Sequence, residues 1–209
     1  MEVLKNLIIK TGKYLYDKDL AGGTSGNISV RCENGILITA SGTALGYLEQ
    51  DDIVLINSDG ELPKTGKKPS SEKMLHIEIY KKRPDINAII HVHPPFCSAF
   101  AASHLELNKA LLAENILYFG KIPLAPYSMP STDKLAQETA LFFADHDVVL
   151  MANHGIVAAD KDLKNAFFKL ETAETFARVV LYAKLLGNEK PLKDSDISEL
   201  LKLKHSLHS

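Results

Sequence analysis

Residues 88–95 read Ala-Ile-Ile-His-Val-His-Pro-Pro, and this stretch decides the fold class. Successive side chains of a strand point to opposite faces, so His91 and His93 share one face while their apolar neighbours take the other. The two prolines end the strand and begin a helix that continues through Ala102, because proline lacks only an amide hydrogen that is unpaired in a first turn. The stretch therefore predicts a strand that runs into a helix and carries two histidines at its end.

Alternating helix and strand patterns precede this stretch. A helix is predicted over residues 2–19, and the small polar loop 22–27 leads from it into a half-buried strand at 28–32. Asn34-Gly35 is a strong hairpin signal before the apolar run 36–38. Another strand at 53–56 has a turn at 58–60, and a polar loop at 63–69 follows.

Helical patterns dominate the rest of the chain. A helix begins at Ser70 or Ser71, either of which can cap it, and stops at Arg83-Pro84. The further predicted elements are a helix at 131–143, a strand at 148–151 that reaches 153–155 and continues through 156–159, and helices at 162–186 and 194–204. This mixture predicts one α/β domain over residues 1–209, with helices flanking a mixed or largely antiparallel sheet rather than a regular parallel βαβ array.

Composition excludes several classes of function. With 24 basic and 26 acidic residues the net charge is -2, so no global field attracts nucleic acid or an acidic membrane surface. No apolar run approaches the roughly 20 residues of a membrane span, and the first residues do not resemble a signal peptide. Cys32 and Cys97 are far apart in unrelated contexts, which is typical of reduced thiols. We expect a cytoplasmic protein without nucleic-acid or membrane partners.

Three histidines are candidate metal ligands. His91 and His93 share a strand face, and His154 follows its own apolar strand, with Gly155 permitting a sharp turn. A histidine pair on a strand can also belong to an ordinary core or surface, but the end of a strand is a favoured place for ligand sites in α/β layers. Three neutral imidazoles with an open position form a catalytic zinc arrangement. The pattern therefore indicates a metal that binds substrate.

Glu72 follows two serines at the predicted start of a helix. One interpretation is structural, because serines cap helices and the helix dipole favours a carboxylate in the first turn. In the other, the unpaired amides and the Ser70 and Ser71 hydroxyls hold a phosphate, and Glu72 removes a proton beside a metal-bound carbonyl. The segments 24–27 and 41–43 offer further donors for an anion, although each alone is also typical of a plain turn.

Five segments in order resemble the class II aldolase/adducin family, and within it the L-fuculose-phosphate aldolases. They are TSGNIS (24–29), LITASG (37–42), PSSE (69–72), HVHPP (91–95) and NHG (153–155). The resemblance covers nearly the whole chain. It implies a mostly antiparallel sheet flanked by helices, assembled as a homotetramer with active sites between subunits.

The resemblance also implies roles for single residues. His91, His93 and His154 match zinc ligands, and Glu72 matches the catalytic acid/base that also touches the metal at rest. The residues that match the phosphate pocket are Asn27, Ser41, Gly42, Ser70 and Ser71, with Ser41 standing where the aldolases have threonine.

The chain departs from this pattern at one tyrosine. The fuculose-phosphate aldolases supply a tyrosine from the neighbouring subunit as a proton donor, but the corresponding stretch near residues 111–113 has none. Tyr118 and Tyr127 are nearby candidates that the sequence does not place. Lys73 suggests Schiff-base chemistry, which the three histidines make unnecessary. We assign no role to His104, His146, His205 or His208, and favour a structural hydrogen bond for His76.

These features together predict a metal-dependent aldolase. The expected reaction is reversible cleavage of a ketose 1-phosphate, such as L-fuculose 1-phosphate, to dihydroxyacetone phosphate and a small aldehyde such as lactaldehyde. The alternatives on the same scaffold are an L-ribulose-5-phosphate 4-epimerase, a methylthioribulose-phosphate dehydratase and a sugar-acid-phosphate decarboxylase. A non-enzymatic module like the adducin head is disfavoured, because such a module has no use for metal-spaced histidines beside an acid and an anion pocket.

Overall fold

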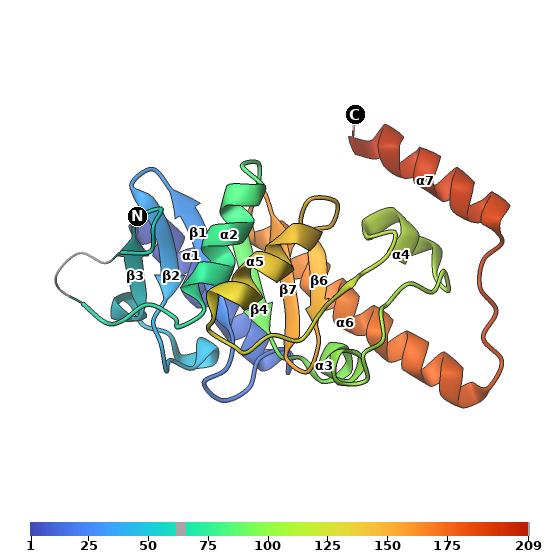
Figure 1. Ribbon diagram of the computed structural model, residues 1–209, viewed down its shortest axis with the longest axis horizontal. Coiled ribbons are helices and arrows are strands. Elements are labelled where there is room, and N and C mark those ends of the chain that lie inside the picture. Colours follow the sequence, from blue (N-terminus) through green and yellow to red (C-terminus); the bar gives the residue numbers. More distant parts are fainter. Residues whose placement is uncertain (62–65, 209) are drawn as a thin grey trace.

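A seven-stranded sheet forms the centre of the protein in the computed structural model, which describes residues 1–61 and 66–208 (Figure 1). The strands are β1 (Asn27–Cys32), β2 (Gly35–Thr39), β3 (Ile53–Ile56), β4 (Ala88–Val92), β5 (Leu124–Ala125), β6 (Val148–Met151) and β7 (Gly155–Asp160). They pair in the order β3-β2-β1-β4-β7-β6-β5, antiparallel except for the pair of β5 with β6. The predicted mostly antiparallel sheet is confirmed.

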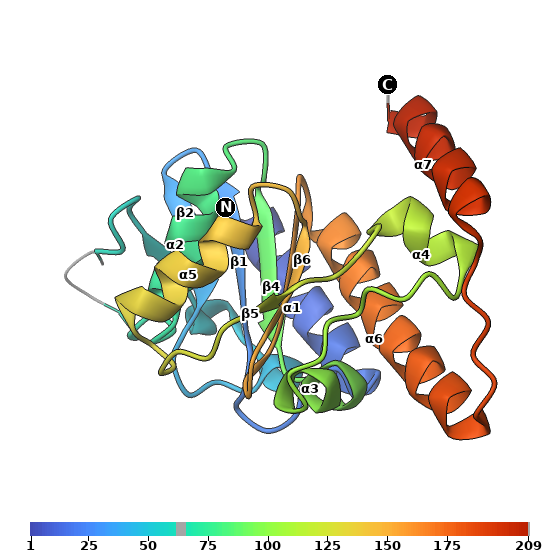
Figure 2. The same ribbon diagram turned by 45° about the vertical axis from the view of Figure 1, so that its right-hand side comes forward.

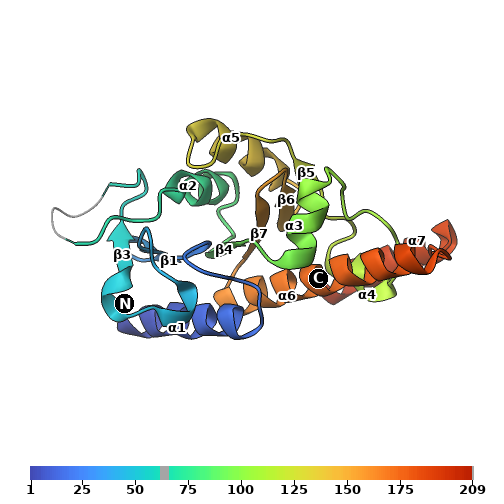
Figure 3. The same ribbon diagram turned by 90° about the horizontal axis from the view of Figure 1, so that it is seen from below.

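Helices cover both faces of this sheet. They are α1 (Glu2–Asp17), α2 (Lys73–Lys82), α3 (Pro95–Ala102), α4 (Ala113–Tyr118), α5 (Asp133–Phe142), α6 (Leu163–Leu186) and α7 (Asp194–His208), with short 3₁₀ turns at Leu45–Tyr47 and Gln50–Asp52. Figure 3 shows α2 and α5 on one side of the strands and α1 and α6 on the other. The protein therefore has three layers, as predicted.

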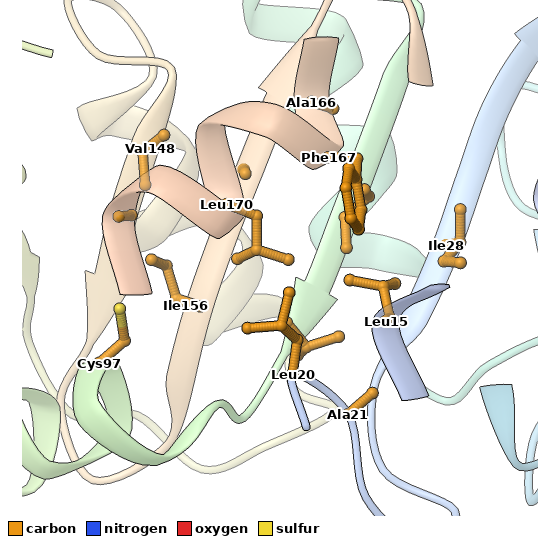
Figure 4. Packing of buried hydrophobic residues seen from close by; sticks show 14 of the residues in the cluster. Leu15, Leu20, Ala21, Ile28, Cys97, Val148, Ile156, Ala166, Phe167 and Leu170 are labelled. Atoms are coloured by element: carbon orange, nitrogen blue, oxygen red, sulfur yellow. The ribbon is translucent and has the colours of Figure 1, made fainter. Parts of the chain in front are cut away.

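Alternation along the strands builds two cores. Ile28 and Ile156 belong to the core under α1 and α6, where they lie close to Leu15 and Leu170 (Figure 4). Ile89, on the opposite face of β4 from Ile90, belongs to the second core, under α2 and α5. β4 is buried on both faces because it is a central strand. Its residue His91 consequently lies on the α2/α5 face with no solvent exposure.

Two helices lie beyond the edge of the sheet. Figure 2 shows α4 and α7 together, outward of α6 and away from the strands. The Lys204 ammonium donates to the Tyr118 carbonyl, and the Leu192 amide donates to the Ala110 carbonyl. Among the described residues, no helix is both long enough and apolar enough to cross a membrane.

Several predicted boundaries need correction. The segments 148–151 and 156–159 do not form one continuing strand, because a turn at Asn153, where φ is 53°, reverses the chain and pairs Met151 with Gly155. Helix α2 begins at Lys73, so Glu72 is its N-cap residue and not part of its first turn. Helix α1 ends at Asp17. Within the predicted loop 63–69, residues 63–65 lie outside the described part.

Candidate active site

The end of β4 positions the first histidine. His91 lies directly opposite Asn27 of β1 on one side and Val157 of β7 on the other. Directly opposed residues of an antiparallel pair project to the same face, so Asn27 and His91 both lie under α2. Gly26 makes this approach possible, because a Cβ there would stand 2.8 Å from the His91 carbonyl oxygen, and its φ of 86° suits glycine.

The turn between β6 and β7 positions His154. Gly155 is needed here because a Cβ would come within 2.5 Å of both His93 Cδ2 and the Val92 carbonyl oxygen. The Asn153 amide donates to the Ala101 carbonyl, and Asn153 Oδ1 lies 2.6 Å from His104 Nε2. These hydrogen bonds hold the turn against the end of α3. His104, to which we assigned no role, therefore helps to hold the turn that carries His154.

The three predicted metal ligands converge. One ligand nitrogen from each of His91, His93 and His154 lies within 4.8 Å of the others. His93 Nε2 lies 3.0 Å from His91 Nε2, and the ring centroids of the three residues are 4.8 to 5.0 Å apart. Residues separated by more than 60 positions therefore form one imidazole cluster.

The hydrogen bonds of this cluster suit a cation. His91 Nδ1 donates to the Ile156 carbonyl at 3.0 Å, which leaves a lone pair on Nε2 of the neutral ring. Glu72 Oε2 faces that lone pair at 3.2 Å. Two acceptors at this distance repel unless a positive charge lies between them. Among the described atoms, His154 Nδ1 is buried without a hydrogen-bond partner. Imidazole and carboxylate donors are ligands that divalent transition metals accept, so the residues fit a metal.

Glu72 lies over the cluster, and its two carboxylate oxygens have different surroundings. Oε2 accepts a hydrogen bond from Asn27 Nδ2 at 3.0 Å. Oε1 lies 3.3 Å from His154 Nε2 and makes no hydrogen bond within the described residues. Burial by itself raises the pKa of this carboxyl. Positive charge on the cluster, acting through the hydrogen bond and charge of His91 and then through the charge of His154, outweighs burial together with the hydrogen bond from Asn27 and lowers the pKa. Glu72 is therefore a carboxylate at neutral pH, with one oxygen held and one free.

Burial keeps the neighbouring imidazoles neutral. Burial first, and then the nearby histidines, lower the pKa of His93 and of His154 to about 4. The same causes lower the pKa of the fully buried His76 to about 3. Neutral rings are the form in which histidine binds a metal. The site is thus ready to bind a cation at neutral pH.

The residues predicted to hold a phosphate come together beside Glu72. An isolated bridge pairs Ala40 with Pro69, and the Ser70 amide donates to the Thr39 carbonyl at 3.0 Å. These contacts join the end of β2 to the start of α2. The predicted residues on the two segments are Ser41, Gly42, Ser70 and Ser71, with Asn27 on the adjacent strand β1. Ser70 and Asn27 are buried, whereas Ser41, Gly42 and Ser71 are exposed.

Sequence reasoning missed some polar residues near the site. Ser131 lies in the segment before α5, and its φ is 64°. Its hydroxyl donates to the Ser71 hydroxyl at 2.9 Å. Ser29 and Tyr80 form a buried chain with His76, in which Ser29 Oγ lies 2.6 Å from His76 Nδ1 and 2.9 Å from the Tyr80 hydroxyl. The signal that could have found Ser29 and Tyr80 was their spacing, because a two-residue step along β1 and a four-residue step along α2 each keep side chains on one face.

Other candidates lie away from the cluster. The Lys73 ammonium donates to the Gly60 carbonyl at 2.6 Å, which engages the amine that Schiff-base chemistry needs. Tyr118 and Tyr127 are exposed, with 45% and 52% of their surface accessible. His146 is half-buried outside the histidine cluster. The side chains of His205 and His208 lie outside the described part.

Comparisons with known proteins agree on one family. Residues 6–181 match the model of the class II aldolase and adducin N-terminal domain. An L-fuculose phosphate aldolase of Methanocaldococcus jannaschii is 40% identical over 177 residues, covering 85% of this chain and 95% of that protein. A solved structure of L-fuculose 1-phosphate aldolase superposes with a TM-score of 0.90 at 32% identity, covering 97% of this chain and 96% of the other.

Other relatives carry different activities in their names. A 5-deoxy-D-ribulose 1-phosphate aldolase of Bacillus thuringiensis is 34% identical and covers 93% of this chain and 92% of its own length. A 3-oxo-tetronate 4-phosphate decarboxylase of Haemophilus influenzae is 31% identical and covers 94% of this chain and 95% of its own. The substrates named for these proteins are all phosphorylated.

Proposed function

Since the chain belongs to the class II aldolase and adducin family, we propose that it is a zinc-dependent aldehyde-lyase that cleaves a ketose 1-phosphate. The products are dihydroxyacetone phosphate and a small aldehyde, as with L-fuculose 1-phosphate and lactaldehyde. The observation that carries the proposal is the carboxylate of Glu72 directly over three converging imidazoles, within 3.3 Å of His91 and His154. The names of the relatives support the aldolase class.

His91, His93 and His154 hold the metal in this proposal, with Glu72 as a further ligand at rest. The lowered pKa values of His93 and His154, and the 3.2 Å contact of Glu72 Oε2 with His91 Nε2, support this assignment. When bound, the zinc ion supplies a Lewis acid that stabilises the negative charge developing on the substrate oxygens. Imidazole sites accept several divalent ions, so another metal is compatible with the same residues.

Glu72 is the acid/base of the proposed reaction. Its Oε1 has no hydrogen-bond partner within the described residues, whereas Oε2 is held by Asn27. A carboxylate oxygen without a donor is the stronger base of the two, so Oε1 takes and returns the proton at the carbon that becomes the nucleophile.

The phosphate pocket comprises Asn27, Ser41, Gly42, Ser70 and Ser71 in this proposal. Hydroxyls, backbone amides and the start of α2 gather there, and a helix N-terminus favours an anion. Since Glu72 is the N-cap residue of that helix, the phosphate and the reacting carbon are held at a fixed separation. A phosphate on the substrate therefore positions the adjacent hydroxymethyl carbon at Glu72.

We assign the protein to the cytoplasm and to a homotetramer with active sites at subunit interfaces. The far end of α6 exposes Tyr182, Leu185 and Leu186, with 52%, 74% and 84% of their surface accessible. Large exposed apolar side chains grouped together are typical of a protein contact. Such a contact can supply the tyrosine that residues 111–113 lack, and Tyr118 and Tyr127 remain candidates because both are exposed.

The decisive test of the reaction is product analysis with a panel of substrates. Zinc-loaded protein is incubated with L-fuculose 1-phosphate, L-ribulose 5-phosphate, methylthioribulose 1-phosphate and a 3-oxo sugar-acid phosphate. We expect dihydroxyacetone phosphate from the first and no epimerised, dehydrated or decarboxylated product from the others, with all activity lost in Glu72→Gln. Epimerised, dehydrated or decarboxylated product without aldol cleavage would replace this proposal by the corresponding alternative, of which the decarboxylase has a named relative.

A further inference from the structure

A buried line of polar residues runs from the candidate site along the interface between β1 and α2. Asn27 and Ser29 are two apart on β1. Glu72, the N-cap residue of α2, is followed at intervals of four residues by His76 and Tyr80 on that helix. Two strand residues advance about 6.7 Å and four helix residues about 6 Å, so the two rows stay in step. All five residues are at most 9% exposed, although four of the five residue types are strongly polar. Their hydrogen bonds must therefore be satisfied among themselves.

Each distance in this line is that of a hydrogen bond. Asn27 Nδ2 lies 3.0 Å from Glu72 Oε2, and Asn27 Oδ1 lies 2.5 Å from His76 Nε2. His76 Nδ1 lies 2.6 Å from Ser29 Oγ, which lies 2.9 Å from the Tyr80 hydroxyl. The Tyr80 hydroxyl also lies 3.3 Å from the Asn87 carbonyl oxygen, a longer contact. The line therefore connects Glu72 to a tyrosine two helical turns away.

Because Glu72 is ionised, the hydrogen bonds along the line can all be assigned a donor and an acceptor. A carboxylate only accepts, so Asn27 turns its NH₂ group toward Glu72 and its oxygen toward His76. His76 must then carry its proton on Nε2, which leaves Nδ1 to accept from the Ser29 hydroxyl. Ser29 Oγ accepts in turn from Tyr80, over the shorter of the two contacts of that hydroxyl. Every donor in the line points toward Glu72.

We propose that His76 is a positioning residue, which fixes the amide of Asn27 so that Oε2 of Glu72 is held and Oε1 is free to react. This proposal rests on the proposed function of Glu72. Without the Nε2 proton of His76, the Asn27 amide can rotate and present its oxygen to the carboxylate, which repels it. Glu72 then loses its one neutral donor and turns within the site. The pKa of His76, lowered to about 3 by burial, keeps the ring in the neutral form that this arrangement needs.

The test compares three variants by one rate. The rate is the exchange of a hydroxymethyl proton of dihydroxyacetone phosphate with deuterium from heavy water, measured over a range of substrate concentrations at saturating zinc so that kcat and KM are both obtained. His76→Phe fills the same space without a donor, His76→Gln restores a donor near the place of Nε2, and Tyr80→Phe removes the far end of the line. We expect His76→Phe to lower kcat about 10- to 100-fold, as loss of an outer hydrogen-bond partner does at metal sites, with KM close to the wild-type value.

The variants also separate positioning from folding. His76→Gln is expected to recover most of kcat and Tyr80→Phe to lose little of it, because Tyr80 acts through two further residues. Folded His76→Phe with wild-type kcat would overturn the proposal, as would His76→Gln no better than His76→Phe. If His76→Phe does not fold, Ser29→Ala takes its place, since it removes the donor to Nδ1 and is expected to lower kcat with KM retained. Wild-type kcat in folded Ser29→Ala would then overturn the proposal.

A second measurement does not depend on activity. Nitrogen NMR of the wild-type protein labelled at histidine reports which nitrogen of His76 carries the proton. We expect Nε2 to be protonated and Nδ1 bare, unchanged between pH 6 and 8 because the pKa lies at about 3. The opposite tautomer would contradict the proposal. If wild-type protein shows no proton exchange, the proposed function fails, while this spectrum still decides the direction of the line.

Discussion

Asn27 and His91 lie directly opposite each other on β1 and β4, and both project under helix α2. This pairing brings the amide that holds Glu72 next to the first metal-ligand candidate, with no flexible loop between them. Glu72 contacts both residues, at 3.0 Å and 3.2 Å. The acid/base and the metal site are therefore built on one rigid strand pair, which is the placement that precise catalytic geometry requires.

Metal binding should stabilise the protein, because the histidine cluster forms only in the folded chain. At zinc one hundred times above its Kd the gain is about 2.7 kcal/mol, visible as a higher Tm that a chelator reverses. His154→Ala should abolish this gain and the bound zinc measured by mass spectrometry. His146→Ala is the matched control, since that half-buried histidine lies outside the cluster. Equal zinc content in both variants would contradict the assignment of His154.

Gly155→Ala should damage the metal site and strain the end of β4 that carries it. The new methyl group would stand 2.5 Å from His93 Cδ2 and from the Val92 carbonyl oxygen, so the imidazole must move. We expect zinc affinity to fall by about 10-fold or more, measured by chelator competition. Gly22→Ala is the matched control, because a Cβ there meets nothing within 4 Å. Unchanged affinity in Gly155→Ala would show that His93 does not bind the metal in this orientation.

Metal-free protein should lose stability as pH falls below about 6.5. The pKa values of His93 and His154 are lowered to about 4, and that of His76 to about 3, against an ordinary value of 6.5. Between these values the unfolded chain binds protons that the folded chain does not, so the free energy of unfolding decreases with decreasing pH. Urea unfolding from pH 7.5 to 4.5 measures this. Stability that rises toward pH 5 would contradict neutral, buried histidines.

Glu174→Gln should loosen the helix that follows His93. The Glu174 carboxylate on α6 accepts the amide hydrogens of Phe96 and Cys97 at 2.8 Å and 2.7 Å, and so caps α3. Replacing one carboxylate oxygen by an NH₂ group leaves one of these amides unpaired, which costs about 1 to 3 kcal/mol. Denaturant unfolding measures the loss. Glu171→Gln on the same helix, which removes only a surface pair with Lys18, should change stability little.

Much of this site could be predicted from sequence because its chemistry follows simple periodicity. The alternation of side chains along a strand placed His91 and His93 on one face. The apolar strand before His154 indicated that this histidine also lies at the end of a strand. A sharp turn was considered at Gly155, but the strand was still predicted to continue past it; the reversal at Asn153 was missed because a polar residue with positive φ leaves no apolar signature and the strands on either side both have buried patterns. Residues 103–130 gave no periodic signal, because α4 and β5 are too short to show one.

The line from Glu72 to Tyr80 shows what sequence alone lacked. The four-residue spacing along α2 and the two-residue spacing along β1 were both readable. Only the register of β1 with β4, and the packing of α2 over them, shows that the two rows meet. His76 was interpreted as a structural hydrogen-bonding residue for this reason, and Ser131 was missed because its partner Ser71 is 60 residues away.

The central claim is that Glu72 removes a proton from a phosphorylated three-carbon unit at the histidine-bound metal. The most direct measurement is proton NMR of dihydroxyacetone phosphate in heavy water with zinc-loaded wild-type protein and with Glu72→Gln. We predict stereospecific loss of one hydroxymethyl proton signal with the wild type, and no loss with the variant although it retains its zinc. The absence of exchange with folded, metal-replete wild-type protein would contradict the account.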